Sequence, residues 1–254
     1  MIISVANQKG GVGKTTTALN ISSALAILGK STLLIDTDPQ AHSTISCVKN
    51  PSQHNNSLYE LLISQDNRVD DYIITSTIPG LKVIISRISM AKLEPTLLGQ
   101  IDGHYRLKDA LSPIRKKYDF IIIDTPPTLG IITLNALVAS DAILIPIQSS
   151  YLSLEGSDDL LETIDKIKKV ANPNLRVLGI LITLHDRRTN LGKDVVSKIK
   201  NVFGRKVFRT IISKSVKLEE SPAYRESIFT YAPHSVGAIQ YKQVAKEIII
   251  RAKN

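Results

Sequence analysis

Cysteine and tryptophan are almost missing from this chain of 254 residues, which has one cysteine, Cys47, and no tryptophan. A single cysteine cannot form a bridge within the chain, so we expect a reducing, cytoplasmic location. Aromatic residues make up only 5% of the chain, and Asp141 interrupts its longest apolar stretch. The first residues carry no basic segment or cleavage site for secretion. We therefore expect neither secretion nor a membrane span.

Short apolar runs alternate with helical patterns along the chain, and 43% of its residues are hydrophobic. Because these runs are apolar on both faces, they predict a buried, mostly parallel sheet. We expect one domain over residues 1–254 with a doubly wound α/β fold and helices on both faces of the sheet. The predicted strands are 2–6, 32–35, 83–86, 120–123, 142–147, 177–183 and 207–210. The predicted helices are 15–28, 58–63, 105–117, 154–170, 193–203 and 236–253.

Positive charge is concentrated in one part of the chain. The formal net charge is +9, and residues 185–217 hold ten basic and two acidic residues, so this window alone carries +8. The window lies in the carboxyl-terminal half of the chain. From charge alone, a polyanion partner and a solvated basic face that binds nothing are both open interpretations.

A glycine-rich loop follows the first predicted strand and precedes the first predicted helix. From residue 7 to 17 it is Asn-Gln-Lys-Gly-Gly-Val-Gly-Lys-Thr-Thr-Thr. Glycines let successive backbone amides turn toward one anion, and the positive end of the helix dipole adds to the attraction. We therefore expect Lys14 to reach the β- and γ-phosphates of a nucleotide and Thr15 to offer a hydroxyl to Mg²⁺. The predicted nucleotide-binding residues are Lys9, Gly10, Gly11, Val12, Gly13, Lys14, Thr15 and Thr16.

The loop departs from the usual pattern G-x-x-x-x-G-K-[ST], because Gln8 stands at the first glycine position and Lys9 follows it. Lys-Gly-Gly-x-Gly-Lys-Thr is the deviant Walker A motif, and with it the sequence resembles the ParA/MinD class of P-loop ATPases. The resemblance implies an ATP-bound sandwich homodimer in which Lys9 reaches across to the phosphates of the other subunit. Gly10 is then expected where the two loops approach closely, so that a side chain there obstructs the dimer.

Aspartates follow the second and fourth predicted strands, in Asp36-Thr37-Asp38-Pro39 and Asp124-Thr125-Pro126-Pro127. Ligands of open α/β sheets bind beyond the carboxyl ends of the strands, so both segments are expected to face the nucleotide. The resemblance implies that Asp124 holds Mg²⁺ through a water, that Asp38 positions the attacking water, and that Asp36 contacts the waters of Mg²⁺ from further out. The predicted reaction is slow ATP hydrolysis by in-line attack of water. Lys9, Lys14 and Asp38 are the predicted catalytic residues, and ATP and Mg²⁺ the predicted cofactors.

Beyond these motifs the resemblance narrows to the chromosome and plasmid partition ATPases, ParA and Soj. Residues 151–156, Tyr-Leu-Ser-Leu-Glu-Gly, are similar to the family's Tyr-x-x-Leu-Glu-Gly, in which Glu155 is expected at the dimer interface with Lys9 and Gly10. Residues 186–191, 207–222 and 231–238 also follow family blocks. The resemblance implies a ParB-like partner protein and a role in segregating a chromosome or plasmid.

Two of these blocks lie in the basic window. The resemblance implies that Arg188 and Lys217 hold duplex DNA without regard to its sequence once ATP has joined two subunits, which places the protein on the nucleoid. Lys214, Arg187, Lys193 and Arg205 or Lys206 are candidate further contacts. Each neutralised phosphate releases counterions, so such binding is expected to weaken steeply with salt. Ser213 replaces a proline in a segment that lies near the adenine in relatives, which leaves the base contact open.

Three other kinds of protein use a similar loop, but the sequence lacks a feature that each of them requires. A MinD-like ATPase on a membrane needs an amphipathic anchor, whereas residues 240–253 read as a helix that packs on the domain, with Val244, Ile248 and Tyr241 inward. A nitrogenase-type iron protein needs cysteines for its cluster, and this chain has one. A small-molecule kinase or synthetase needs an acceptor site, and no motif in the sequence indicates one.

Overall fold

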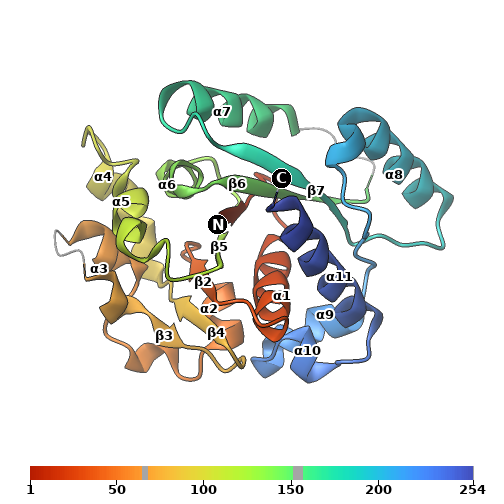
Figure 1. The fold of residues 1–254 in the computed structure, drawn as a ribbon, viewed down its shortest axis with the longest axis horizontal. Helices are drawn as coiled ribbons and strands as arrows, with labels where there is room; N and C mark the ends of the chain where they lie inside the picture. The colour runs from red at the N-terminus through yellow and green to blue at the C-terminus, as the bar shows by residue number, and fades with distance from the viewer. Residues whose placement is uncertain (65–67, 151–156, 254) are drawn as a thin grey trace.

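The computed structural model describes residues 1–64, 68–150 and 157–253, and one sheet of seven strands lies at its centre (Figure 1). The strand order is β3-β4-β2-β5-β1-β6-β7, and all neighbouring pairs are parallel except β3 with β4. The strands are β1 (Ile2–Val5), β2 (Thr32–Asp36), β3 (Ile74–Thr75), β4 (Leu81–Ile84), β5 (Phe120–Asp124), β6 (Ala142–Gln148) and β7 (Arg176–Thr183). β1 lies between β5 and β6, so the chain reverses its direction of winding at β1, and ligands of such sheets bind at this point.

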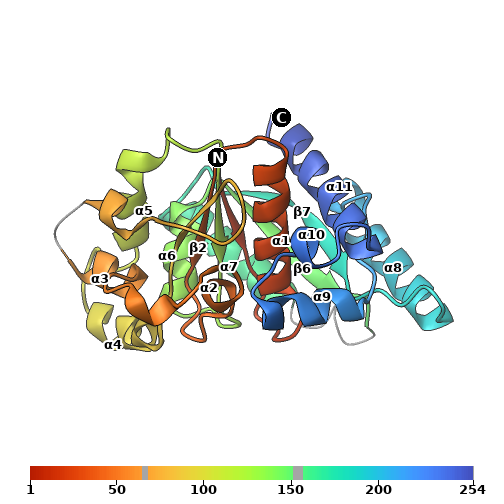
Figure 2. The same ribbon diagram turned by 90° about the horizontal axis from the view of Figure 1, so that it is seen from below.

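Helices cover both faces of the sheet (Figures 1 and 2). One face carries α1 (Lys14–Ile27), α2 (His42–Cys47), α9 (Val216–Glu220), α10 (Ile228–Tyr231) and α11 (Val236–Arg251). The other carries α3 (Leu58–Ile63), α4 (Leu93–Leu97), α5 (Arg106–Leu111), α6 (Ile131–Ala139), α7 (Ser157–Val170) and α8 (Asn190–Phe203). The predicted doubly wound α/β fold is therefore confirmed. None of the described helices is long and apolar enough to cross a membrane.

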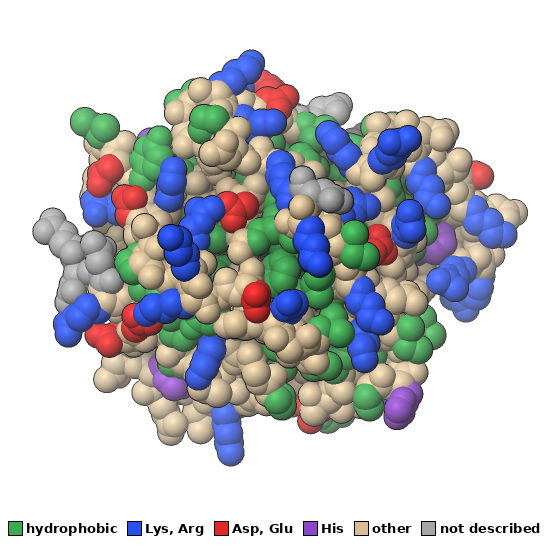
Figure 3. All heavy atoms as spheres, viewed as in Figure 1, with side chains coloured by type: hydrophobic (Ala, Val, Ile, Leu, Met, Phe, Trp, Pro, Cys, Tyr) green, Lys and Arg blue, Asp and Glu red, His purple; other side chains and the backbone are tan. Residues whose placement is uncertain are grey.

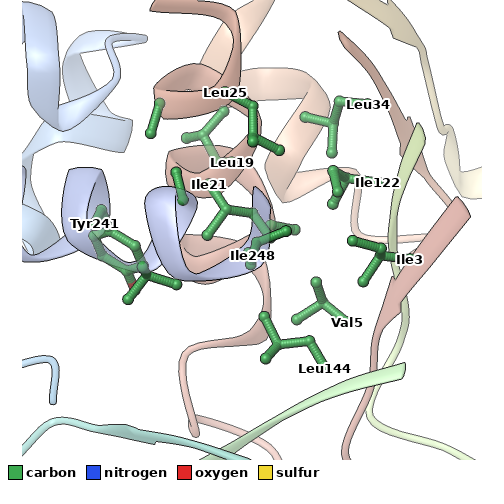
Figure 4. Packing of buried hydrophobic residues seen from close by; sticks show 14 of the residues in the cluster. Ile3, Val5, Leu19, Ile21, Leu25, Leu34, Ile122, Leu144, Tyr241 and Ile248 are labelled. Atoms are coloured by element: carbon green, nitrogen blue, oxygen red, sulfur yellow. The ribbon is translucent and has the colours of Figure 1, made fainter. Parts of the chain in front are cut away.

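The helix after the phosphate loop is buried on almost every side, because α1 packs between the sheet and α11. Figure 4 shows Leu19, Ile21 and Leu25 of α1 between the strand residues and the side chains of Tyr241 and Ile248 on α11. Polar groups on α1 are satisfied within the fold: the hydroxyls of Ser22 and Ser23 donate to the carbonyls four residues earlier at 2.7 Å. The burial of Val244, Ile248 and Tyr241, expected from the sequence, is confirmed.

The strand predicted over 207–210 is wrong. This segment lies beside β7 but forms only one isolated bridge, between Ile180 and Val207. Side chains of α11 occupy the backbone groups that a strand would pair: the Glu247 carboxylate accepts the amides of Arg209 and Thr210 at 2.9 Å each. The Arg251 guanidinium donates to the carbonyl oxygens of Lys206 and Val207.

Several helix boundaries also differ from the prediction. The helix expected over 105–117 ends at Leu111 and continues as a 3₁₀ turn over Ser112–Ile114, because Pro113 cannot continue an α-helix. The helix expected from 193 begins at Asn190, where the Thr189 hydroxyl caps it by accepting the amide of Gly192 at 3.1 Å. The short helices α2 and α4 and the apolar helix α6 were not predicted.

Candidate nucleotide site and basic loops

The glycine-rich loop connects β1 to α1 and is held from both sides. The Asn7 side chain bridges it to β6, because its amide donates to the carbonyl of Pro146 at 2.7 Å and its oxygen accepts the amide of Lys9 at 3.0 Å. The Thr183 hydroxyl, at the end of β7, donates to the carbonyl of Val12 at 2.8 Å. Gly13 has φ +83°, a conformation that glycine adopts without strain, and it starts α1. The loop thus has the form that phosphate binding requires.

The two lysines of the loop lie in different environments. Lys14 is 6% exposed, and its ammonium donates to the carbonyl of Lys9 at 2.7 Å. Burial lowers the pKa of Lys14, while the nearby carboxylates of Asp124 and Asp38 oppose that shift. Lys9 is half-buried, and Gly10 beside it is exposed with no atom within 4 Å of the position of a Cβ. Lys14 therefore points into the site, whereas Lys9 and Gly10 lie at the molecular surface.

Asp36 and Asp124 meet where β2 and β5 end, since they are direct neighbours in the register of the two strands. Both are fully buried. Asp36 is occupied by the protein itself: it accepts the amide and hydroxyl of Thr44 at 2.8 and 2.7 Å, and the amide of Asp38 at 3.1 Å. Asp124 accepts the hydroxyl of Ser43 at 2.7 Å through one oxygen, and its other oxygen, Oδ1, is buried without a partner among the described residues.

The two carboxyls resist ionisation together. Burial raises the pKa of Asp124, the neighbouring charge of Asp36 adds to the rise, and the hydroxyls of Ser43 and Thr15 oppose it. Burial likewise raises the pKa of Asp36, against the hydrogen bonds from Thr44. A cation placed at this end of the sheet favours the ionised form of both groups.

A magnesium ion bound together with a nucleotide fits these residues. Mg²⁺ takes few ligands from proteins and completes its octahedron with phosphate oxygens and water. No cluster of three or more His, Cys, Asp or Glu side chains that could hold a metal ion is found among the described residues. The unpartnered Oδ1 of Asp124 and the Thr15 hydroxyl near it supply the oxygen atoms that such an ion requires from the protein.

Asp38 lies beside this pair and is 7% exposed. Its carboxylate accepts the amide of Gln40 at 2.9 Å, and its carbonyl accepts the hydroxyl of Ser86 at 2.6 Å. The structure therefore brings together Lys14, Asp36, Asp38 and Asp124, as the sequence predicted. It also adds residues that were not predicted, because no spacing pattern marks them: Asn7, Ser43, Thr44, Ser86 and Thr183 hold the loop and the carboxylates in place.

A cavity of about 250 Å³ opens beside the loop, next to Gly13 and Thr16. Its other walls come from the end of β7, from residues 212–222 and from Tyr241. Ser213 does not line it, because the Ser213 amide and hydroxyl bind the side chain of Gln240 at 2.9 and 3.0 Å. Ile212 and Ser215 line the cavity instead.

The basic loops of the carboxyl-terminal half lie next to this cavity. Residues 184–188 and 212–217 are joined by a bridge between His185 and Ser213 and by the amide of Lys214, which donates to the carbonyl of His185 at 3.0 Å. Arg187, Arg188, Lys214 and Lys217 are all exposed on these loops. The basic loops and the phosphate loop are far apart in the sequence but lie at the same end of the sheet. Residues 184–188 directly follow β7, and Thr183, the last residue of β7, contacts the phosphate loop.

Two of these basic residues are held by carboxylates of the same chain. Arg188 forms a two-pronged ion pair with Asp186, at 3.0 and 2.8 Å, and this contact lowers the pKa of Asp186. Lys217 contacts Glu220 at 3.0 Å, and Glu220 also accepts the hydroxyl of Tyr231 at 2.8 Å. Glu155, the remaining predicted interface residue, lies outside the described residues.

The chain matches known proteins over its full length. Residues 1–177 match a family model described as an AAA domain. Over 247 residues the chain is 42% identical to the sporulation initiation inhibitor protein Soj of Bacillus subtilis, covering 97% of each protein. This chain belongs to the ParA/Soj family of partition ATPases. A second ParA/Soj relative, the chromosome partitioning protein ParA of Myxococcus xanthus, is 38% identical over 250 residues, which cover 98% of this chain and 88% of the relative.

The fold is also that of solved P-loop ATPases. Cobyrinic acid a,c-diamide synthase from Mycobacterium smegmatis, solved with bound ADP and magnesium, superposes with a TM-score of 0.87. The two are 32% identical, and the match covers 100% of this ParA/Soj chain and 95% of the synthase.

Proposed function

We propose that this ParA/Soj protein dimerises with ATP, binds duplex DNA without regard to sequence in that state, and hydrolyses ATP slowly to drive the segregation of a chromosome or plasmid. One observation carries the proposal. The loops 184–188 and 212–217 line the cavity beside the phosphate loop and also carry Arg187, Arg188, Lys214 and Lys217. A nucleotide bound there touches the segments that present the basic residues, which links nucleotide state to DNA binding.

ATP fits the site with its phosphates on residues 9–16 and its adenine in the cavity beside Gly13 and Thr16. Thr15 and Asp124 would hold Mg²⁺, with Asp36 keeping the end of β2 and the start of α2 in place around it. When bound, Mg²⁺ neutralises charge on the β- and γ-phosphates. The relatives by sequence favour partition over small-molecule synthesis, because they match the chain with higher identity than the synthase does.

The chain's own residues divide the work of hydrolysis. Lys14 brings a buried positive charge to the transferred phosphate, where low polarity strengthens the attraction. Asp38, close enough to oppose the pKa shift of Lys14, orients the attacking water. Lys9 supports the phosphate of the opposite subunit, and its exposed neighbour Gly10 lets the two loops approach. A monomer lacks Lys9 in trans, so turnover depends on dimerisation and is slow.

Dimerisation doubles the basic surface that DNA meets, and each phosphate contact adds to the salt dependence of binding. This makes the protein a nucleoid-bound ATPase in its ATP state and a free one after hydrolysis. A ParB-like partner would set the timing by stimulating turnover. A MinD-like role on membranes is not favoured, because Tyr241, Val244 and Ile248, which form the main apolar face of α11, are packed in the core.

Nucleotide-dependent DNA binding tests the proposal. Fluorescence anisotropy with a scrambled 40-base-pair duplex is expected to show binding with ATP and Mg²⁺, loss of binding with ADP, and a steep decline with salt. Anionic liposomes serve as the second arm. Equal binding with ADP would refute the nucleotide switch, and recruitment to liposomes without DNA binding would favour a MinD-like function.

A further inference from the structure

A second basic surface lies away from the loops just described. Between Gly204–Lys206, the segment that follows it, and the carboxyl-terminal half of α11, the structure has an open cavity of about 690 Å³. Its charged walls are Arg176, Arg205, Lys206, Arg209, Arg251 and Glu247. Leu178 and Ile250 contribute apolar surface to it. We call this cavity the edge groove, because it lies against β7, the edge strand of the sheet.

Three of the charged groups in the edge groove are occupied by the fold. The Arg176 guanidinium donates to the carbonyl of Arg251 at 3.1 Å. Arg251 donates to the carbonyls of Leu178, Lys206 and Val207 and lies 4.1 Å above the ring of Phe208. Glu247, the one carboxylate in the lining, accepts backbone amides from the segment beside β7. None of these three side chains is available to an external ligand without breaking these contacts.

Three basic side chains remain in the groove: Arg205, Lys206 and Arg209 are exposed. Over residues 1–64, 68–150 and 157–253, no carboxylate forms a salt bridge with any of them. Arg188 and Lys217, in contrast, already contact Asp186 and Glu220. A DNA phosphate must compete with a carboxylate for Arg188 or Lys217, whereas it meets uncompensated charge in the edge groove.

The edge groove continues toward the proposed DNA surface. A second hollow of about 480 Å³ shares Arg209 and Glu247 with it and extends to Arg187 and Lys246. The edge groove starts at Arg176, the first residue of β7, and the second hollow reaches Arg187, which lies beyond the last residue of β7. The eight residues of β7 span roughly 26 Å at about 3.3 Å each. Figure 3 shows Lys and Arg side chains over the whole of this face, and few Asp and Glu among those on the right, where Figure 1 places α8.

The geometry points to the edge groove as a binding site for the phosphodiester backbone of duplex DNA, with Arg205, Lys206 and Arg209 as the contacting residues. This inference rests on the proposed function and changes its location: the strongest DNA contacts lie along the edge of β7, and Arg188 and Lys217 add to them. The groove begins at Arg176, at the end of β7 opposite the phosphate loop, so a dimer joined through the loops leaves it open. Flexible exposed cations that contact phosphates carry no sequence preference.

The test compares two variants that each lose three positive charges. The groove variant combines Arg205→Gln, Lys206→Gln and Arg209→Gln. The control combines Lys92→Gln, Lys108→Gln and Lys116→Gln, which are exposed residues around α4 and α5. With ATP and Mg²⁺, the groove variant is expected to lose about tenfold or more in DNA affinity, and the slope of log affinity against log salt is expected to flatten by about 2 or more. The control is expected to change affinity less than about threefold.

Further measurements separate failure of this inference from failure of the proposed function. Thermal unfolding and DNA-free ATP turnover of the groove variant are expected to match those of the unmodified protein, since the side chains of Arg205, Lys206 and Arg209 form no salt bridge with the described residues. If the unmodified protein binds DNA and the groove variant equals the control, DNA does not occupy the groove, and an acidic protein segment becomes its candidate ligand. If Arg188→Gln and Lys217→Gln alone remove the whole salt dependence, the inference is also overturned. Absence of ATP-dependent DNA binding in the unmodified protein would refute both proposals.

Discussion

Replacing Asp124 by asparagine is expected to stabilise the nucleotide-free protein while destroying its function. The fold raises the pKa of Asp124 from an ordinary 3.8 to about 8, mainly through burial. The folded protein therefore holds a proton that the unfolded chain releases, so stability falls as the pH rises from about 4 to about 8. At about 1.4 kcal/mol for each unit of pKa, the upper bound of this loss is roughly 6 kcal/mol. Asparagine does not ionise, so the Asp124→Asn protein does not lose this stability as the pH rises.

The gain in the variant is expected to be smaller than that bound. Part of the rise in the pKa of Asp124 comes from the charge of Asp36, which stays in the variant. The amide group of the asparagine also needs a hydrogen-bond partner at the position where Oδ1 of Asp124 has none. We expect about 2–4 kcal/mol at pH 8, which raises Tm by roughly 5–10 °C for a protein of this size. At pH 5 Asp124 of the unmodified protein is still protonated, so only a small part of the stability has been lost. The difference in Tm between the variant and the unmodified protein is therefore expected to shrink to less than about 3 °C.

Differential scanning fluorimetry in EDTA without nucleotide, at pH 5 and pH 8, measures both differences. Asp165→Asn on the exposed surface of α7 is the control, and its Tm relative to the unmodified protein is expected to be the same at both pH values. Binding of ATP with Mg²⁺ is expected to fall in Asp124→Asn. A Tm difference that does not depend on pH, or an Asp124→Asn protein that is less stable at pH 8, would refute the reasoning.

Three further outcomes are expected. Gly10→Val should leave Tm within about 2 °C and ATP affinity nearly unchanged, because a Cβ at Gly10 meets no atom within 4 Å. The variant should, however, form no ATP-dependent dimer in light scattering, and a Gly10→Val protein that dimerises would show that Gly10 does not lie at the interface. Lys14→Ala should weaken ATP binding about 10- to 100-fold, whereas Asp38→Ala should bind ATP and accumulate the dimer, and normal hydrolysis by Asp38→Ala would contradict its role. Gly179→Ala places a Cβ 2.5 Å from the carbonyl oxygen of Lys206 and 2.6 Å from the Phe208 ring, so it should cost about 1–3 kcal/mol of stability. An unchanged melting curve would contradict this and would mean that the segment 206–208 moves away from β7.

The core strands and the chemistry of the site could be predicted because both depend on local patterns. Runs that are apolar on both faces indicate buried parallel strands whatever surrounds them. Likewise, the order of strand, glycine loop, Lys14 and helix, with aspartates at the ends of later strands, produces one site in any doubly wound sheet. The segment 207–210 has the same apolar pattern as a strand, but Glu247 and Arg251 bind its backbone from a distant helix. The local sequence pattern of residues 207–210 does not show that side chains of α11 compete with β7 for these backbone groups.

The sequence by itself determined the fold class, the phosphate loop and the presence of a basic window, since each follows from neighbouring residues and their order. Only the tertiary structure decided which of the basic residues are uncompensated. Arg188 meets Asp186 and Lys217 meets Glu220, whereas Arg205, Lys206 and Arg209 face an open groove whose single lining carboxylate is bound to backbone amides. Charge along a chain is additive, but the field that a DNA phosphate meets depends on distances between residues that only folding sets.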